Sequence, residues 1–159
     1  MPKLYILCGP SGCGKSTWAQ KFMDIYFDED IRYVSRDEIR FSLLKDDEEY
    51  FSHEKEVFRK FAATLALTLS DGFDVIADAT HITKISRQKL TQAIDRLFTD
   101  YQIVYVNCYL DEETCVIHNS ARAGRLHVPE QVVRNMCRQF EVPSLTEDSR
   151  AIEIIGSEV

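Results

Sequence analysis

The sequence lacks internal repeats, low-complexity runs and linkers, and no apolar stretch reaches the length that crosses a membrane. Its five cysteines lack the paired spacing of a zinc site. Their odd number and their scatter through apolar segments favour reduced thiols in a cytosolic protein. We therefore expect a cytoplasmic protein with no signal peptide ahead of its first strand and no membrane partner.

An excess of positive charge is also missing, because 26 acidic residues outnumber 19 basic ones and the formal net charge is −7. A sequence-independent grip on long duplex nucleic acid needs many Lys and Arg contacts to phosphates, so the charge balance argues against that function. A local basic groove that receives only the end of a strand remains compatible with it.

Apolar runs of strand length alternate with helical patterns, which predicts a parallel sheet covered by helices. A length of 159 residues fits a single domain over 1–159 with its own core. Ser35 is the expected N-cap of the second helix, with Glu38 completing a capping box. Strands are expected at 3–8, 32–34, 74–77, 102–110 and 151–155, and helices at 15–26, 36–44, 48–70, 86–98, 112–122 and 129–140.

The most informative segment is 9–16 (GPSGCGKS), which fits the Walker A pattern G-x-x-x-x-G-K-[ST] at every fixed position. A strand before it and a helix after it supply the context of a phosphate loop, although a glycine-rich turn in another α/β protein is the alternative. We expect Lys15 to reach the β and γ phosphates and the Ser16 hydroxyl to bind Mg²⁺. The expected nucleotide contacts come from Gly9, Ser11, Gly12, Cys13, Gly14, Lys15, Ser16 and Thr17.

The segments that follow the first three strands should meet in one cleft, because functional groups collect at the carboxyl ends of parallel strands. Asp37, in the first turn after the second strand, is the candidate base for a hydroxyl. Arg36 and Arg40 flank it, and Arg40 shares its helix face, which suits a hydroxyl held beside a phosphate. Helix-start electrostatics with an ordinary i,i+3 ion pair explain the same spacing equally well.

Asp78 ends the buried strand 74–77, where a Walker B carboxylate acts on Mg²⁺ or its water shell. Alternatively, Asp78 lines the acceptor site together with Thr80, or it only caps the next turn. The functional alternatives are favoured because the first strand already shows where the phosphates lie.

Segment 119–129 is a basic, glycine-broken connection between two helices. Such a segment can close as a lid and bring Arg122 and Arg125 onto the phosphates, although a solvated helix end that complements the dipole is the alternative. Three further cations either receive a polyanionic acceptor or form a solvated helix face: Lys84, Arg87 and Lys89.

These pieces in this order resemble the 5′-hydroxyl polynucleotide kinase domain of phage-type end-healing enzymes over most of the chain. The resemblance is carried by 14–19 (GKSTWA), 36–40 (RDEIR), 78–80 (DAT), and 119–122 (NSAR) leading to 128–129 (VP). The Walker A part is common to many kinases, whereas its STWA continuation together with the RDxxR segment is more specific. The resemblance implies an adenylate-kinase-like, three-layer P-loop NTPase fold with an arginine lid.

The resemblance also implies roles for individual residues. Asp37 would be the general base on a 5′-hydroxyl end of RNA or DNA, Arg40 would bind the acceptor's phosphate, and Arg122 would bind the donor phosphates. ATP and Mg²⁺ are the implied cofactors. Larger members of the family carry a fused phosphatase with a D-x-D-G-T motif, which this chain lacks. Healing of a 3′ end would therefore need a separate phosphatase, with a ligase as a further partner.

Two other functions stay open. A kinase for a small hydroxyl compound, such as a sugar, a nucleoside or an antibiotic, would share the phosphate loop, the post-strand Asp and the arginine lid. The acidic net charge favours it, whereas Arg40 beside Asp37 favours an acceptor that carries its own phosphate. A nucleotide-dependent regulatory switch is the third possibility, and the retained base and lid residues argue against it.

Overall fold

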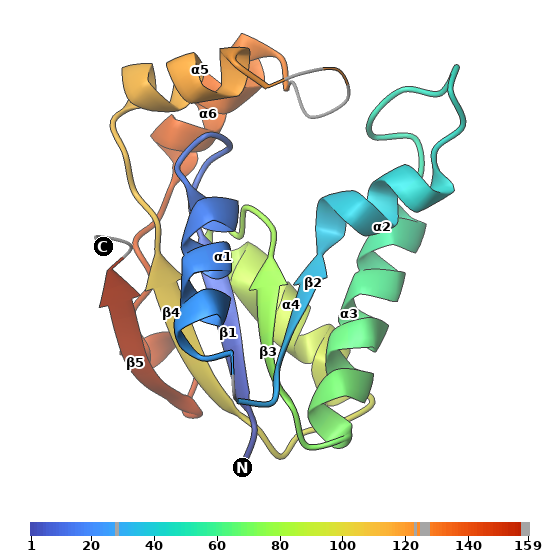
Figure 1. The fold of residues 1–159 in the computed structure, drawn as a ribbon, viewed down its shortest axis with the longest axis vertical. Coiled ribbons are helices and arrows are strands. Elements are labelled where there is room, and N and C mark those ends of the chain that lie inside the picture. Colours follow the sequence, from blue (N-terminus) through green and yellow to red (C-terminus); the bar gives the residue numbers. More distant parts are fainter. Residues whose placement is uncertain (28, 123, 125–127, 157–159) are drawn as a thin grey trace.

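The computed structural model describes residues 1–27, 29–122, 124 and 128–156 (Figure 1). A parallel sheet forms the centre of the structure, with its strands in the order β2-β3-β1-β4-β5. The strands are β1 (Lys3–Cys8), β2 (Ile31–Ser35), β3 (Asp74–Asp78), β4 (Gln102–Asn107) and β5 (Ala151–Gly156). Each lies at or within a few residues of its expected position, and β5 pairs with β4 at one edge.

Helices cover both faces of the sheet. They have to, because the side chains of the central strand β1 alternate between the two faces and are apolar on both. Leu4 and Ile6 of β1 pack into a core with α3 (Glu54–Ser70) and α4 (Lys84–Asp95). Tyr5 and Leu7 point to the other face and pack with the remaining long helices. These are α1 (Lys15–Ile25), α5 (Glu112–Ser120) and α6 (Glu130–Gln139), while α2 (Arg36–Leu43) extends from β2 towards α3. The expected three-layer P-loop architecture is confirmed.

Side-chain caps explain where several helices begin. The Ser35 hydroxyl accepts a hydrogen bond of 3.2 Å from the Glu38 backbone N–H, so α2 starts at Arg36 as expected. Asp111 caps α5 through the backbone N–H of Thr114 in the same way. Thr83 caps α4 in a capping box with Ser86, which moves the start of that helix two residues ahead of the expected one.

The expected start of the long helix at residue 48 is wrong, because α3 begins at Glu54. Residues 45–53 form turns in which the Glu48 side chain binds a local backbone group instead of starting a helix. The Glu48 carboxylate accepts from the Lys45 backbone N–H at 2.9 Å and contacts the His53 ring at 2.6 Å. The turns form an arm at the end of α2 (Figure 1).

Strand β4 ends at Asn107 rather than at the expected residue 110. Its partner β1 ends at Cys8, opposite Asn107, where the chain turns into the phosphate loop. Beyond this point β1 offers no extended backbone for β4 to pair with. The last hydrogen bond between the two segments is the one of 2.8 Å that the Cys108 backbone N–H donates to the Cys8 carbonyl.

Arg87, one of the cations considered for acceptor binding, is buried and has a structural role. Its guanidinium donates to both carboxylate oxygens of Glu147 at 2.9 and 2.7 Å and to the His81 carbonyl at 2.8 Å. The two charged side chains are 1% and 3% exposed, so the pair ties α4 to the short 3₁₀ turn η2 (Leu145–Glu147). The expectation that Arg87 receives an acceptor is therefore corrected.

All five cysteines are free thiols. Within the described ranges, no helix combines the length and the apolar character that a membrane crossing requires.

Replacing Glu147 by Gln should leave the buried guanidinium of Arg87 without its counter-charge. We expect the free energy of unfolding to fall by about 3–5 kcal/mol, the cost of breaking a buried ion pair. Urea unfolding followed by circular dichroism measures it, with Glu153→Gln on the exposed edge strand as the matched control. Equal stability of the two variants would show that the pair does not stabilise the fold.

Candidate active site

The phosphate loop lies at the carboxyl end of β1 and leads into α1. Close backbone contacts explain two of its glycines. A Cβ atom on Gly9 would lie 2.1 Å from the Cys108 carbonyl oxygen, and one on Gly12 would lie 2.2 Å from the Cys115 carbonyl oxygen. The loop thus packs directly against the backbone around α5, and no side chain larger than hydrogen fits between them.

Lys15 folds back over this loop. Its ammonium donates hydrogen bonds to the carbonyls of Gly9 at 3.0 Å and Pro10 at 2.8 Å, and its Nζ lies 3.6 Å from the sulfur of Cys13. A hydrogen bond from the Cys108 thiol, opposed by burial and assisted by the Lys15 charge, lowers the pKa of the Cys13 thiol.

Ser16 joins the loop to β3. Its hydroxyl donates a 2.9 Å hydrogen bond to Oδ2 of Asp78, and the Tyr33 hydroxyl donates to the same oxygen. Burial, followed by the charge of Asp78, raises the pKa of Tyr33, so its hydroxyl stays protonated. A hydroxyl and a carboxylate side by side are hard oxygen ligands that fit Mg²⁺, which typically takes one or two protein ligands beside phosphate and water.

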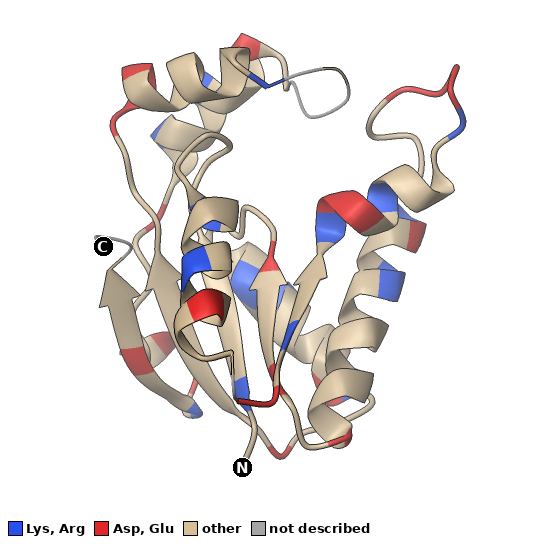
Figure 2. Cartoon of the chain, in the orientation of Figure 1, with Lys and Arg blue, Asp and Glu red and all other residues tan. Residues whose placement is uncertain are grey.

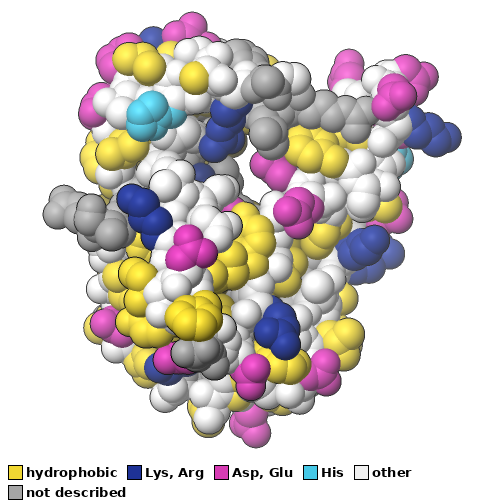
Figure 3. All heavy atoms as spheres, viewed as in Figure 1, with side chains coloured by type: hydrophobic (Ala, Val, Ile, Leu, Met, Phe, Trp, Pro, Cys, Tyr) yellow, Lys and Arg dark blue, Asp and Glu magenta, His cyan; other side chains and the backbone are white. Residues whose placement is uncertain are grey.

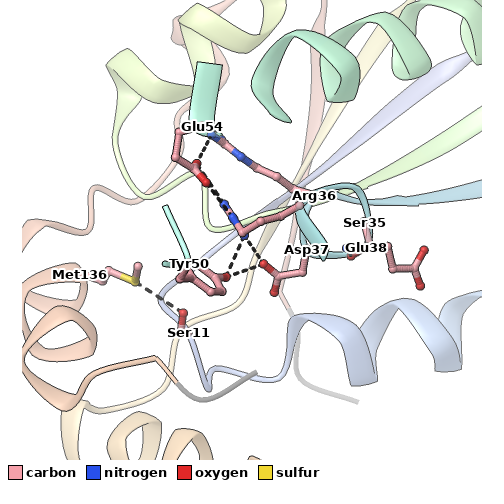
Figure 4. Close-up of polar contacts among 9 residues, drawn as sticks. Ser11, Ser35, Arg36, Asp37, Glu38, Tyr50, Glu54 and Met136 are labelled. Carbon is pink, nitrogen blue, oxygen red and sulfur yellow. Dashed lines mark hydrogen bonds and ion pairs between the residues drawn. The ribbon is translucent and has the colours of Figure 1, made fainter. Parts of the chain in front are cut away.

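The helix α2 and the arm after it form a second polar group around Asp37 (Figure 4). Asp37 accepts hydrogen bonds from the Arg40 guanidinium and from the Tyr50 hydroxyl, the latter at 2.5 Å. Arg40 also donates to both oxygens of Glu54, at 2.7 and 3.1 Å. Arg36 donates to the same carboxylate at 3.1 Å. One glutamate therefore holds two arginines, and one of them, Arg40, binds Asp37.

The protonation states within this group agree with its geometry. Burial works against the charge of Glu54, but hydrogen bonds from Arg40 and the nearby Arg36 hold the pKa of that carboxyl below its ordinary value. Burial and the bond to Asp37 raise the pKa of Tyr50, which keeps its hydroxyl a donor to the carboxylate. The Asp37 carboxylate is thus held by two donors, and its side chain is 35% exposed to the cavity and solvent.

Both groups face one cavity of about 480 Å³ (Figure 3). It opens between the lobe formed by α5 and α6 and the arm beyond α2 (Figure 1). A backbone hydrogen bond of 2.8 Å from Gly9 to Thr80 brings the loops after β1 and β3 together. Sequence-expected residues that line the cavity are Ser11, Lys15, Ser16, Arg36, Asp37, Arg40, Asp78, Thr80 and Arg122.

Among the described residues, the cavity is electrically balanced although the chain is acidic. The charged part of this described lining consists of four cations, Lys15, Arg36, Arg40 and Arg122, and four carboxylates, Asp37, Glu38, Glu54 and Asp78. Figure 2 shows both signs side by side on α2, whereas the arm beyond it is mainly acidic. The excess negative charge therefore lies elsewhere on the chain.

Some expected residues stay outside this lining. Thr17 is exposed at the start of α1, and Gly14 forms the bend into that helix. Arg125 lies outside the described residues. Arg122 follows α5 and reaches the cavity from the side opposite α2.

Three side chains of the site are missing from the sequence-based expectations: Tyr33, Tyr50 and Glu54. Two arginines spaced i,i+4 on one helix require a counter-charge, and that requirement is the one signal that could have indicated a carboxylate such as Glu54. Nothing in the local pattern of the two tyrosines distinguishes them from ordinary core residues.

A family model described as an AAA domain, AAA_33, matches residues 4–143. The chain belongs to this family. With its phosphate loop, parallel sheet and kinase-like neighbours, this AAA_33 chain is a kinase-type, nucleotide-binding P-loop domain. A search of curated proteins finds no match to the sequence.

Solved structures similar to the AAA_33 chain include kinases for different acceptors. One from the Pnkp1/Rnl/Hen1 RNA repair complex has a TM-score of 0.71 and 26% identity over 87% of this chain, which spans 43% of that chain. A fungal RNA kinase has a TM-score of 0.66 and 14% identity over 98% of this chain and 38% of that chain. A sugar kinase from Janibacter sp. HTCC2649 has a TM-score of 0.67 and 14% identity over 99% of this chain and 86% of that chain. The last two likenesses show the fold alone.

Alanine at Gly12 and at Gly14 should separate close contact from backbone strain. Both glycines have positive φ, 85° and 89°, but a Cβ at Gly14 meets nothing within 4 Å. We expect Gly14→Ala to cost about 1–2 kcal/mol of unfolding free energy, the strain of a left-handed residue. Gly12→Ala should cost more and weaken nucleotide binding, as measured by urea unfolding and calorimetry. Equal losses in the two variants would contradict the contact with α5.

Proposed function

We propose that this protein transfers the γ-phosphate of ATP to the 5′-hydroxyl end of a polynucleotide, as one kinase domain over residues 1–159. The observation that carries the proposal is the position of Asp37. It accepts a hydrogen bond from Arg40, whose partner Glu54 also binds Arg36, and it faces the same cavity as the phosphate loop. The RNA repair structure, which has more sequence identity to this chain than the sugar kinase, supports the same acceptor class.

The donor half would be the phosphate loop with its flanking residues. Bound phosphates would replace the Gly9 and Pro10 carbonyls as partners of the Lys15 ammonium. Ser16 and Asp78 would hold Mg²⁺, which when bound neutralises charge on the β and γ phosphates. Arg122 would add a cation from the opposite side of the cavity, with Arg125 as the second lid arginine of the proposal.

The acceptor half would be the group around Asp37. Its carboxylate would accept the proton of the 5′-hydroxyl as the new oxygen–phosphorus bond forms and the bond to the leaving ADP breaks. Arg36 donates one N–H to Glu54, which leaves most of its guanidinium for an anion on the acceptor. Arg40 donates to Glu54, Asp37 and Tyr50, and these bonds leave one of its five N–H groups for the same anion. Thr80 would line the acceptor side. A neutral sugar has no group that needs two arginines there.

A kinase for a small hydroxyl compound is the second candidate. The acidic net charge of −7 favours it. The sugar kinase from Janibacter, 86% of which is covered, shows that this fold also occurs in a kinase for a small acceptor.

Acceptor choice separates these functions directly. With γ-labelled ATP and Mg²⁺, we expect label on 5′-OH oligonucleotides and on nucleoside 3′-monophosphates but not on sugars or unphosphorylated nucleosides, because the arginines require an acceptor phosphate. Omission of Mg²⁺ should abolish transfer. Label on a sugar alone overturns the polynucleotide proposal, and ATP binding without label on any acceptor favours a nucleotide-dependent switch.

Asp37→Asn should lower kcat by on the order of 10²–10⁴, the usual contribution of a general base. ATP affinity should stay within about twofold, since Asp37 belongs to the acceptor half. The matched control is Asp47→Asn, the same charge change on an exposed residue of the arm. Single-turnover rates measure the chemical step, and a near-normal rate for Asp37→Asn would exclude it as the base.

A further inference from the structure

A second cavity of about 250 Å³ lies behind the acceptor half of the first. Arg36 and Thr80 line both cavities, so the two share a wall at the carboxyl end of β3. Its remaining lining residues come from α3, from the loop after β3 and from α4: Phe58, His81, Ile82, Ser86, Lys89 and Leu90. The described lining contains two cations and no carboxylate, unlike the first cavity.

Two residues of this lining each carry a buried nitrogen that has no hydrogen-bond partner in the described part of the chain. These nitrogens are Nε of Arg36 and Nε2 of His81. Buried polar groups are almost always paired, so each of these atoms marks a position where a ligand group or water is expected. His81 is only 5% exposed and is held in place by stacking on Phe61, with ring centroids 6.0 Å apart.

The two nitrogens have opposite hydrogen-bonding roles, one as an acceptor and the other as a donor. Nδ1 of His81 lies 2.7 Å from the Leu7 carbonyl, which can only accept, so Nδ1 carries the hydrogen. Burial lowers the pKa of His81 to about 3, and the neutral ring leaves Nε2 as an acceptor. Nε of Arg36 is a donor in every state. The cavity thus needs a ligand that carries a donor and an acceptor close together.

We infer that this cavity is an RNA subsite for the sugar and phosphate of a nucleotide near the reacting end. A phosphate oxygen would accept from Arg36, with Lys89 nearby, and the adjacent ribose 2′-hydroxyl would donate to His81. The inference rests on the proposed function and adds to it a preference for RNA over DNA. Deoxyribose carries no hydroxyl at this position and would leave the His81 nitrogen unpaired.

Size and charge favour such a ligand over a single trapped water. The cavity is far larger than one water molecule needs. Lys89 and the guanidinium N–H groups that Arg36 does not donate to Glu54 favour an anion, and the apolar Phe58, Ile82 and Leu90 suit the carbon face of a sugar. Arg36 lines both cavities and so connects the reacting end to its neighbouring nucleotide. A strand with its 5′-hydroxyl at Asp37 would continue past Arg36 into the second cavity.

Substrates test the inference without any change to the protein. We expect 5′-OH RNA oligonucleotides with one 2′-deoxy sugar, moved through the first three nucleotides, to lose about three- to tenfold in kcat/KM at one position, the contribution of one hydrogen bond. A 2′-fluoro sugar at that position should lose as much, because it keeps the ribose pucker but cannot donate. Full activity with 2′-fluoro, or equal activity at all three positions, overturns the inference.

Two variants place the effect in this cavity. His81→Asn suits the positive φ of 43° and removes the ring nitrogen, so the deoxy penalty should disappear in it. Lys89→Gln, which alters an exposed side chain, should raise KM for oligonucleotides and reduce the slope of log affinity against log salt by about 0.7. Lys60→Gln, on the exposed side of α3, is the matched control and should change neither.

The outcomes distinguish the inference from the proposed function. Absence of label on every oligonucleotide refutes both. Label on RNA and DNA at equal rates, with no effect of Lys89→Gln, retains the kinase and refutes the subsite. A deoxy penalty that persists unchanged in folded His81→Asn protein assigns the 2′-hydroxyl to another residue and overturns the role of His81.

Discussion

Parallel pairing of β1 with β3, continued to β2, determines where every group of the site lies. Because the three strands run in the same direction, their carboxyl ends lie together. The phosphate loop, the Asp78 loop and the start of α2 all leave the sheet there. The register places Ser35 opposite Asp78, so Tyr33 reaches the Asp78 carboxylate that also holds Ser16. A slip of one residue would turn these side chains to opposite faces of the sheet.

Within that arrangement, Glu54 organises the side of the cavity that we propose for the acceptor. Its carboxylate binds Arg36 and Arg40 at once, and Arg40 in turn binds Asp37. The long arginine side chains would otherwise lose much conformational freedom on binding a substrate, about 2 kcal/mol each at most. Fixing them in the folded protein means that the acceptor meets a site that is already ordered.

Patterns over neighbouring residues predict much of this structure from the sequence. Alternating apolar runs locate the strands within a few residues, and the phosphate loop locates the donor side because its chemistry is entirely local. The start of α3 could not be predicted that way, since the acidic run before it resembles a helix start but the Glu48 carboxylate binds turn backbone instead. Glu54, Tyr33 and Tyr50 reach the site through tertiary contacts. The burial of Arg87 likewise depends on Glu147, 60 residues away in the chain.

An acidic chain with a balanced cavity is a reasonable design for recognising an end instead of a length of nucleic acid. Each phosphate that a protein neutralises on a single strand contributes about 0.7 to the salt dependence of binding, so extended basic surfaces bind any strand tightly. Here the net charge is −7, yet cations and carboxylates are equal in number among the described residues that line the cavity. Attraction is then confined to the few groups that contact Arg36, Arg40 and Lys15. Selectivity would come from the chemistry at the terminus, a free hydroxyl next to a phosphate, and the rest of the surface would repel continuous nucleic acid.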